Sequence, residues 1–464
     1  MCWSMPPVRK TRIPVALTIA GSDSGGGAGI QADLKTFAVM GVHGASAITS
    51  ITAQNTMEVR AIHDVPPDVV KAQVEAVADD LGVDAAKTGM LSNTGIIKAV
   101  AEVVDEYGFP LVVDPVMVAK SGARLLKPEA EEALKKLVIP RATIVTPNAP
   151  EAEVLTGVKV VDLDTAREAA RIIVEELGAE AAVVKGGHLR GEYVVDVLYH
   201  RGEYRLFKER RIEKATTHGT GCAFSAAIAA GLAKGRSVEE AVDVAKKFIT
   251  VAVDYGLEIG GGHGPVNPVA WQAIPAGRWE VLENLEKAGE TLRQAEDVVH
   301  TLVPEVLMNI AMAIPYPYAR TPLDVAAFPG RIGVHMGRLV FKGKPEFGAS
   351  RHMARLVLAA MSVNPDIRAA GNIKYSKDVV RAAEDLGLLT YRGDRRAEPP
   401  DVKAREGGTL PWMLRSAYES LGRLPDVIYD EGEVGKEPMV RILGRTAVDV
   451  ARVIVDIARR VARG

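Results

Sequence analysis

A glycine-rich stretch that runs into a helix-forming segment has the residue types needed to bind an anion. It reads Thr217-His218-Gly219-Thr220-Gly221-Cys222, and the small residues 223–230 follow at once. Glycines ahead of such residues predict a tight loop that opens a helix whose first amides are free and attract phosphate. Cys222 would lie at the helix start, where a thiol ionises more easily. The alternative is an ordinary glycine turn before a buried helix.

Polar residues also follow most of the apolar runs earlier in the chain. Gln54 has an amide that can read the donor and acceptor edge of a flat heterocycle, and Met90 could pack against its ring. Asn148 and Glu151 are three residues apart and could hold hydrated Mg²⁺ through oxygen ligands, while Lys185 could neutralise a phosphate. The remaining candidates of this kind are the glycine-rich loop 21–29 with Asp33 behind it, and the run Asp114-Pro115-Val116-Met117.

Several of these residues also have a purely structural interpretation. Asn148 and Glu151 have the spacing of a helix capping box. Asp33 would be a first-turn carboxylate favoured by the helix dipole, and Lys185 a solvated charge at a strand end. Because the carboxyl ends of parallel strands meet at one edge of a sheet, the six sites taken together favour a shared crevice.

The elements that must position these residues alternate between short apolar runs and amphipathic segments. Continuous Val/Ile runs predict strands buried on both faces, hence an α/β fold with a largely parallel sheet. Residues 194–199 and 204–207 predict an antiparallel hairpin at the sheet edge. The expected strands are 15–20, 45–52, 85–88, 111–114, 143–146 and 181–185, and the expected helices are 29–40, 67–81, 93–107, 128–137, 165–177, 221–234 and 238–255.

The bulk composition limits the classes of function. A length of 464 residues predicts two or three domains, and the net charge of −2 gives no basic excess for nucleic acid. No apolar run approaches the roughly 20 residues of a membrane span. Residues 1–12 have no apolar signal core and are expected to form a disordered tail. Two cysteines make no disulfide framework, so a cytoplasmic location is expected.

A second module is expected behind a boundary rich in glycine and proline at residues 260–268. The first domain would therefore span 13–268. Residues 279–302 have a helical apolar stripe, so 269–302 is interpreted as a linker helix, or as the first helix of the next domain. From 303 to 464 the pattern predicts a second, smaller α/β domain. Its basic residues lie next to glycines, which suits a phosphorylated ligand as well as an ordinary arginine-rich surface.

The first module resembles the hydroxymethylpyrimidine and hydroxymethylpyrimidine-phosphate kinases of thiamine biosynthesis, in the ribokinase-like superfamily. The resemblance is carried by residues 20–36, Gln54-Asn55-Thr56, Asp114-Pro115-Val116-Met117, Lys185-Gly186-Gly187-His188 and His218-Gly219-Thr220-Gly221-Cys222, and it covers about residues 13–268. It implies a three-layer α/β/α fold and ATP-dependent phosphorylation of 4-amino-5-hydroxymethyl-2-methylpyrimidine and then of its monophosphate. Pyridoxal kinase remains possible as a side activity.

The same resemblance implies roles for particular residues. Gln54 and Asp33 would bind the aminopyrimidine edge, with Gly21, Met90 and Val116 beside the substrate. Lys185 would hold the ATP phosphates together with Mg²⁺ at Asn148, Glu151 and Asp114. The amides from Gly219 through Thr220 and Gly221 to Cys222 would stabilise the transferred phosphoryl group. Cys222 as the catalytic base is a hypothesis, because a thiol with a pKa of about 8.5 accepts a proton weakly at neutral pH.

The second module resembles the archaeal-type thiamine-phosphate synthase domain. Pro329-Gly330-Arg331-Ile332, Ser350-Arg351-His352 and Gly435-Lys436-Glu437-Pro438 carry the likeness. It implies that pyrimidine diphosphate and thiazole phosphate are joined to thiamine phosphate with release of pyrophosphate. Arg331 would then carry leaving-group charge, and His352 would bind or orient a phosphate at a helix start. Arg320, Asn372, Lys374 and Lys436 are further candidates for substrate binding.

A sensor is the alternative from another class, because the same domain type occurs in regulators that bind thiamine phosphates. Such regulators carry a basic helix-turn-helix, which is not evident in this sequence, so synthesis is favoured. The expected partners are the small-molecule substrates, with no nucleic acid and no membrane. The kinase family is commonly dimeric, and the edge hairpin offers a surface for a homodimer.

Overall fold

The computed structural model describes residues 12–118, 122–404, 407–433 and 435–463. The chain divides into two compact units, residues 1–272 and 273–464. The expected tail, residues 1–12, lies outside the described residues except for Arg12, whose Nη2 is 2.7 Å from Oδ1 of Asp84. Within the described ranges, no helix is both long and apolar enough to cross a membrane.

The first unit is built on one sheet with the order β3-β2-β1-β4-β5-β6-β7-β8-β9. The six strands from β2 to β7 in this order run parallel, and β3, β8 and β9 are antiparallel to their neighbours. The predicted parallel sheet is therefore confirmed. The strands are β1 (Val15–Asp23), β2 (His43–Gln54), β3 (Val59–Asp64), β4 (Ala85–Thr88), β5 (Leu111–Val113), β6 (Ile144–Val145), β7 (Ala181–Val184), β8 (Tyr193–His200) and β9 (Glu203–Arg210).

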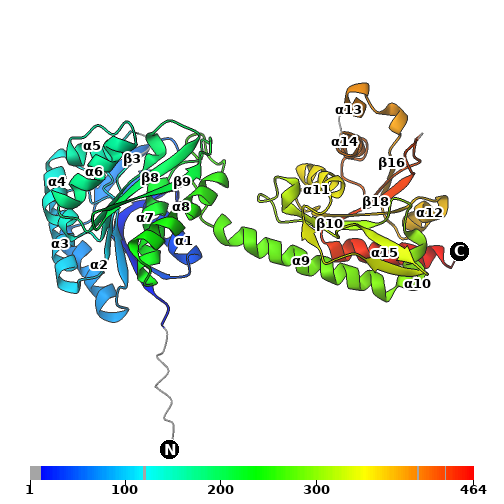
Figure 1. Cartoon of the computed structure of the whole chain (residues 1–464), viewed down its shortest axis with the longest axis horizontal. Helices are drawn as coiled ribbons and strands as arrows, with labels where there is room; N and C mark the ends of the chain where they lie inside the picture. Colours follow the sequence, from blue (N-terminus) through cyan, green and yellow to red (C-terminus); the bar gives the residue numbers. More distant parts are fainter. Residues whose placement is uncertain (1–11, 119–121, 405–406, 434, 464) are drawn as a thin grey trace, which may run out of the picture. The chain divides into compact units, whose positions relative to one another are not determined.

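Helices cover both faces of this sheet and complete three layers, as Figure 1 shows. The layer on one face shares a hydrophobic cluster with α2 (Pro67–Asp80), α3 (Thr94–Tyr107), α4 (Pro128–Ala133), α5 (Ala149–Thr156) and α6 (Leu163–Glu175). The other face packs against α1 (Gly29–Val39), α7 (Thr220–Ala233) and α8 (Val238–Asp254). The expected three-layer α/β/α arrangement is confirmed.

Helix α7 lies deep in its layer because its side chains are small. A Cβ at Gly231 would be 2.8 Å from the Cβ of Ala241, so α7 and α8 approach each other closely. Residues 223–231 of α7 are all buried. This packing fixes the helix that begins directly after the glycine-rich stretch, and with it the direction of the first amides.

The edges of the sheet show what the sequence pattern did and did not predict. The hairpin β8–β9 lies at one edge, as expected. The opposite edge is β3, which the sequence analysis missed because its residues are largely exposed and lack a clean alternation. The helix α5 was also missed as an element, although its capping box was weighed as an alternative.

The second unit has a mostly antiparallel sheet with the order β14-β11-β10-β15-β18-β17-β16, in which only β16 and β17 are paired in parallel among the described strands. A separate hairpin joins β12 (Ile332–His335) and β13 (Arg338–Phe341). The expected second, smaller α/β domain is present. The sheet strands are β10 (Asn309–Ala313), β11 (Val325–Ala327), β14 (Glu346–Phe347), β15 (Ala369–Lys374), β16 (Thr390–Arg392), β17 (Val427–Asp430) and β18 (Met439–Gly444).

Helices lie on both faces of this second sheet as well. One face packs against α9 (Ala270–Gln294), α10 (Glu296–Val299), α12 (Lys377–Asp385) and α15 (Ala447–Val461), and the other against α11 (Arg351–Val363) and α14 (Thr409–Leu421), with α13 (Pro400–Ala404) preceding α14. Helix α9 begins at Ala270, nine residues earlier than the apolar stripe suggested. Since Leu285, Ala288 and Leu292 are fully buried in the second core, α9 is the first helix of this unit over most of its length.

Candidate active sites

The glycine-rich loop after β1 is tied to the stretch before α7 by one carboxylate. Oδ2 of Asp23 accepts hydrogen bonds from Nε2 of His218 at 2.9 Å and from the amides of Gly27 and Ala28, and Oδ1 accepts one from Gly25. Burial alone would raise the pKa of Asp23, but these hydrogen bonds lower it below its usual range. The two loops therefore form one connected structure.

The backbone at the start of α7 is shaped by glycine. Gly219 precedes the helix with φ +81°, and a Cβ there would lie 1.8 Å from the carbonyl oxygen of Gly27. In the described part of the chain, the amides of Gly219, Gly221 and Cys222 donate to no protein acceptor. Free amides at a helix N-terminus, with no side chain in the way, can hold a phosphoryl group.

Charged side chains from three strand ends converge next to these amides. Nζ of Lys185 lies 3.1 Å from Oδ1 of Asp114 and 4.0 Å from Oε2 of Glu151. A Cβ at Gly221 would be 3.3 Å from that Nζ. Burial alone would lower the pKa of Lys185, but Asp114 and Glu151 raise it, so the lysine stays charged. A cation therefore stands beside free amides.

Asn148 and Glu151 form the capping box that the sequence left open as an alternative. The Asn148 amide donates to Oε2 of Glu151 at 2.8 Å, and the Glu151 amide donates to Oδ1 of Asn148 at 2.9 Å. Burial, together with the charge of Asp114, raises the pKa of Glu151 to about 7. Asp114 and Glu151 both face Nζ of Lys185. The capping-box interpretation is therefore confirmed, and a magnesium role for these oxygens stays a prediction.

Cys222 lies near the buried ion pair of Lys87 and Asp33, and its predicted easy ionisation is wrong. Burial of the thiol raises the pKa of Cys222 from 9.0 to about 12, although the charge of Lys87 acts in the opposite direction. Nζ of Lys87 is 2.9 Å from Oδ2 of Asp33, and both side chains are fully buried. Although Cys222 is only half-buried, desolvation of its sulfur outweighs the helix-start effect.

Asp33 is not positioned as the sequence analysis expected. Its Oδ2 accepts from Oγ1 of Thr18 at 2.7 Å as well as from Lys87, and its Oδ1 has no hydrogen-bond partner in the described chain. The carboxylate therefore lies within the protein layer between α1 and the sheet. Contact of Asp33 with a pyrimidine edge finds no support in this geometry.

The other residues proposed around a ring lie at or just after the ends of β1, β2, β4 and β5. A Cβ at Gly21 would be 3.1 Å from Sδ of Met90, so these two residues are in contact. Nε2 of Gln54 lies 3.4 Å from Nε2 of His218, and Val116 is half-buried after β5. Gln54 is thus close to the hydrogen bond between His218 and Asp23 that connects the two glycine loops. A substrate hydroxyl that is phosphorylated would have to lie near the free amides there.

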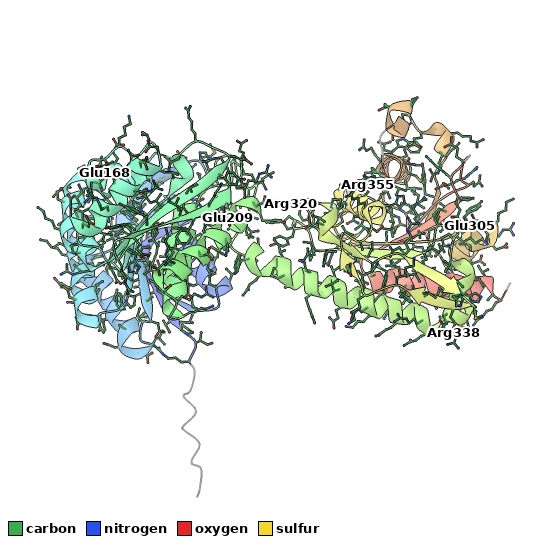
Figure 2. All side chains as sticks on the ribbon, viewed as in Figure 1. Glu168, Glu209, Glu305, Arg320, Arg338 and Arg355 are labelled. Atoms are coloured by element: carbon green, nitrogen blue, oxygen red, sulfur yellow. The ribbon has the colours of Figure 1, made fainter. Side chains whose placement is uncertain are left out.

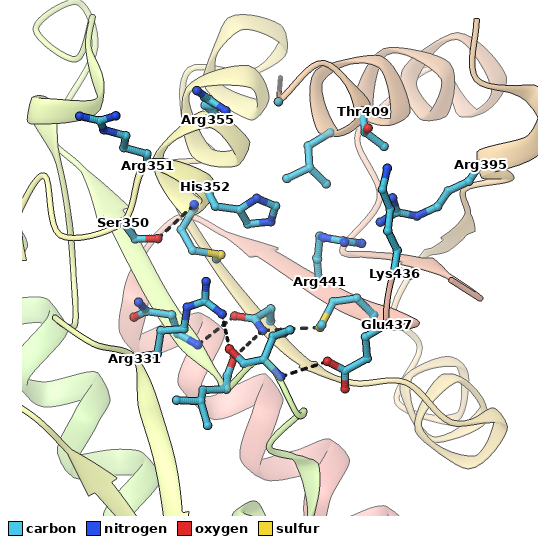
Figure 3. Close-up of a pocket in the computed structure, with 18 of the residues that line it drawn as sticks. Arg331, Ser350, Arg351, His352, Arg355, Arg395, Thr409, Lys436, Glu437 and Arg441 are labelled. Carbon is cyan, nitrogen blue, oxygen red and sulfur yellow. Dashed lines mark hydrogen bonds between the residues drawn. The ribbon is translucent and has the colours of Figure 1, made fainter. Parts of the chain in front are cut away.

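The second unit contains a cavity of about 570 Å³. It is lined by the candidates Arg331, His352, Asn372 and Lys436, and by Asn309, Arg355, Arg395 and Arg441, which the sequence analysis did not single out. Figure 3 shows Arg441 between His352 and Arg395. The missed Arg441 had one visible signal, because it is a charged residue inside the apolar strand β18.

Polar side chains fix the floor of this cavity. Oδ1 of Asn372 accepts from the Asn309 amide at 2.9 Å, and the two oxygens of Glu437 accept from the amides of Glu305 and Val306. Arg331 has φ +65° and donates through Nη1 to the carbonyl of Val306. The floor is therefore held by hydrogen bonds before any ligand enters.

Two candidates of the second unit do not line the cavity. Arg320 lies in the loop before β11, and its amide donates to Oδ2 of Asp324 at 3.0 Å. Figure 2 shows Arg320 far from Glu305, which borders the cavity through Glu437. Lys374 is exposed at the end of β15. Their expected contact with a ligand in this cavity is not supported.

Comparison with known proteins agrees with this geometry. Residues 23–267, more than half of the chain, match the family model described as phosphomethylpyrimidine kinase. The chain belongs to this kinase family. Residues 284–456 match the model described as thiamine-phosphate synthase ThiN, so the second unit is a ThiN domain.

Individual relatives of the kinase domain give the same result. The hydroxymethylpyrimidine/phosphomethylpyrimidine kinase of Bacillus subtilis is 49% identical over 259 residues, which are 55% of this chain and 95% of that protein. The thiamine biosynthesis bifunctional protein ThiED of Geobacter sulfurreducens is 50% identical over 254 residues, 54% of this chain and 52% of that protein.

The solved structures similar to the kinase domain include pyridoxal kinases. The ADP complex of the Bacillus subtilis enzyme has 42% identity and a TM-score of 0.53, and covers 56% of this chain and 98% of its own. The Staphylococcus aureus enzyme with AMP-PCP and pyridoxal has 37% identity and a TM-score of 0.53, and covers 56% and 96%. The ribokinase-like expectation for the kinase domain is confirmed.

Proposed function

We propose that the kinase domain uses ATP to phosphorylate 4-amino-5-hydroxymethyl-2-methylpyrimidine and then its monophosphate, and that the ThiN domain joins the resulting diphosphate to thiazole phosphate. The observation that supports this most directly is the position of Lys185 beside the free amides of Gly219, Gly221 and Cys222. The transition state of phosphoryl transfer is stabilised by this combination of a cation and fixed backbone dipoles.

The kinase residues would divide the work by position. The amides before α7 would stabilise the charge that develops on the transferred group, and Lys185 would hold the oxygens of the donor phosphates. Gln54 would orient the aminopyrimidine, with Gly21, Met90 and Val116 around it. Magnesium, when bound near Asp114, Asn148 and Glu151, would supply a further positive charge at the phosphates. Cys222 would contribute its amide rather than a thiolate.

The ThiN residues would act on the diphosphate that the kinase domain makes. The bond between the pyrimidine methylene carbon and the diphosphate oxygen breaks, the thiazole nitrogen forms a new bond to that carbon, and pyrophosphate leaves with the electron pair. Arg331 and Lys436 would oppose the charge of the phosphates. His352 would orient an oxygen, and Asn372 would keep the cavity floor in place.

One coupled assay tests this proposal. The full chain is given ATP, magnesium, the pyrimidine alcohol and thiazole phosphate, and thiamine phosphate is measured over time. Formation of thiamine phosphate is expected, and it should cease when Lys185→Ala stops the supply of diphosphate. Adding ready-made pyrimidine diphosphate to that variant should restore the product. Failure to restore it would leave the ThiN domain as a sensor of thiamine phosphates.

Phosphorylation of pyridoxal is a second candidate activity, because pyridoxal kinases are among the solved structures similar to the kinase domain. Competition between the two alcohols for limiting ATP would rank them, and the pyrimidine is expected to be preferred. The expected homodimer and cytoplasmic location stay predictions. Sedimentation of the full chain checks the first.

A further inference from the structure

A buried carboxylate in the ThiN domain holds two arginines at the wall of the cavity. Oδ1 of Asp430 lies 2.7 Å from Nε of Arg395, and Oδ2 lies 2.7 Å from Nη1 of Arg441. The side chain of Asp430 is fully buried, while those of Arg395 and Arg441 are 9% and 4% exposed. Asp430 also accepts from the amide of Gly432 at 3.0 Å. The carboxylate of Asp430 therefore holds the two guanidinium groups in place at the wall of the cavity that they line.

The charges of this cluster do not balance. Among the described residues of this cluster, one carboxylate faces two guanidinium groups, so one positive charge is left over at a site with little solvent. A buried excess charge is costly unless a partner of opposite sign is present. The one carboxylate among the described cavity-lining residues, Glu437, already accepts from the amides of Glu305 and Val306. Lys436 adds a further cation on the same wall, as Figure 3 shows.

We infer that Arg395 and Arg441, held in place by Asp430 and joined by Lys436, form a subsite for a diphosphate group. This inference rests on the proposed condensation and names the part of the cavity that receives the diphosphate end of the pyrimidine and retains it as pyrophosphate leaves. Thiazole phosphate takes a position outside this subsite.

The number and type of the cations favour a diphosphate over a monophosphate. A diphosphate ester carries about three negative charges near neutral pH, because its last proton leaves near pH 6. Of the three cations on this wall, Asp430 neutralises one, so a net charge of about +2 faces the cavity. This excess favours the more highly charged diphosphate over a monophosphate. Arginines fixed by a carboxylate present their remaining N–H groups in one plane, which suits paired phosphate oxygens better than a mobile ammonium does.

The test separates the two phosphorylated substrates. The full chain and the variants Arg395→Gln and Arg441→Lys are supplied with ready-made pyrimidine diphosphate and thiazole phosphate, without ATP. The KM for the diphosphate should rise about tenfold to a hundredfold, as expected from loss of one charge-assisted contact, with the KM for thiazole phosphate within about twofold of the wild type. Arg392→Gln is the matched control, because Arg392 pairs with Glu431 and does not line the cavity.

A binding measurement distinguishes failure of this inference from failure of the proposed condensation. Inorganic pyrophosphate and, separately, inorganic phosphate are titrated into the full chain in a calorimeter, with the nucleotide site of the kinase domain filled by ADP. Pyrophosphate affinity should fall at least about tenfold in Arg395→Gln, while the unfolding transition of the ThiN domain, which reports its folding, stays close to that of the wild type. Unchanged pyrophosphate affinity, or an equal loss for both substrates in the KM measurement, overturns the subsite. If the wild type forms no thiamine phosphate but its pyrophosphate binding still depends on Arg395, the proposed condensation is overturned and the subsite is not.

Discussion

His218 and Asp23 are 195 positions apart in the chain, yet Nε2 of His218 lies 2.9 Å from Oδ2 of Asp23. A carboxylate can only accept, so the imidazole donates this hydrogen bond. The contact joins the loop expected to face the pyrimidine to the loop expected to face the transferred phosphate. A Cβ at Gly27 would lie 2.3 Å from Cδ2 of His218, so the imidazole packs directly on the first loop.

We predict that Asp23→Asn separates these loops and slows both phosphorylations. In the wild type, the backbone amides of Gly27 and Ala28 donate to Oδ2 of Asp23. In the variant, the side-chain NH₂ of the asparagine is a donor and cannot accept these hydrogen bonds. A displacement of about 1 Å between reacting groups costs about a hundredfold in rate, so kcat/KM should fall by about that factor. Steady-state kinetics with each pyrimidine substrate measures the effect.

The chain offers two controls for this variant. Thiamine phosphate formation from ready-made diphosphate should be unchanged, because the ThiN domain carries its own cavity. His200→Gln is the matched histidine variant, since His200 pairs with Glu239 at 2.8 Å at the far end of β8 and should leave the kinase rate unchanged. Full kinase activity in Asp23→Asn would show that the loops hold their positions without this contact.

A second prediction concerns the thiol of Cys222. Its pKa of about 12 means that the thiol stays protonated from pH 7 to 9 in the free chain. In a Cys2→Ser background, alkylation of Cys222 at pH 7.5 should be at least about a hundredfold slower than that of an ordinary thiol with a pKa near 8.5. Cys222→Ala should retain at least about a tenth of the kinase turnover, because the backbone amides remain. A thiolate base would instead give fast alkylation and a loss of about a thousandfold.

The buried ion pair of Lys87 and Asp33 yields a prediction on stability. Lys87→Met leaves Asp33 with a charge at a site that has no exposure, which should destabilise the kinase domain by about 3–5 kcal/mol. Lys87→Met combined with Asp33→Asn should recover most of that loss, because no uncompensated charge remains. Calorimetric unfolding of the transition that ADP shifts upward measures both variants. Equal destabilisation in the single and double variants would contradict the proposed charge effect.

His352 should be neutral in the free chain at the pH of the cell. Partial burial first, and then the positive charges of Arg441 and Arg331, lower the pKa of His352 to about 4. Since its folded pKa lies below the unfolded value near 6.5, His352 binds its proton less readily in the folded state, and stability falls as the pH drops from about 6.5 toward 4. NMR of the Cε1–H signals, assigned with His352→Gln, should show no titration between pH 5.5 and 8. Pyrophosphate, by adding negative charge, should raise this pKa.

The sequence could predict the kinase site to the extent that topology brings strand ends together. Lys185, Asp114 and Gly221 each follow a strand or open a helix at the carboxyl edge of the sheet, so a parallel sheet places them side by side. Contacts that depend on side-chain packing were not predictable in this way. In the sequence, Lys87 belongs to a strand-end motif. Its neighbours along the chain give no sign that its side chain forms an ion pair with Asp33.

The ThiN domain was harder to predict from sequence because its sheet is antiparallel. Antiparallel neighbours place successive loops at opposite ends, so a basic residue next to a glycine does not report which end it occupies. Lys374 was chosen from a polar stretch that contains a glycine and Arg320 from a polar stretch that does not, and both lie away from the cavity. Arg395 comes from a short turn far from β18, and only the buried Asp430 brings it next to Arg441.

The last prediction concerns Glu151, whose carboxyl group has a pKa of about 7 because burial and the charge of Asp114 outweigh the attraction of Lys185. The folded pKa lies above the ordinary 4.5, so the folded state holds this proton more tightly than the unfolded state. Its contribution to stability is therefore full below about pH 4.5 and is lost as the pH rises through 7. Over the same range the carboxylate forms that could attract magnesium, so kcat/KM for MgATP should rise with pH.

Glu151→Gln separates these two effects. Its amide oxygen can still accept from the Asn148 amide, which keeps the cap of α5 intact. Because no charge has to be buried at high pH, the variant should unfold at a higher temperature than the wild type at pH 8 and at the same temperature at pH 5. Its kcat/KM for MgATP should be lower and nearly independent of pH between 6 and 8. A pH profile identical to the wild type would mean that another group titrates in this range, and that the buried carboxyl of Glu151 serves α5 alone.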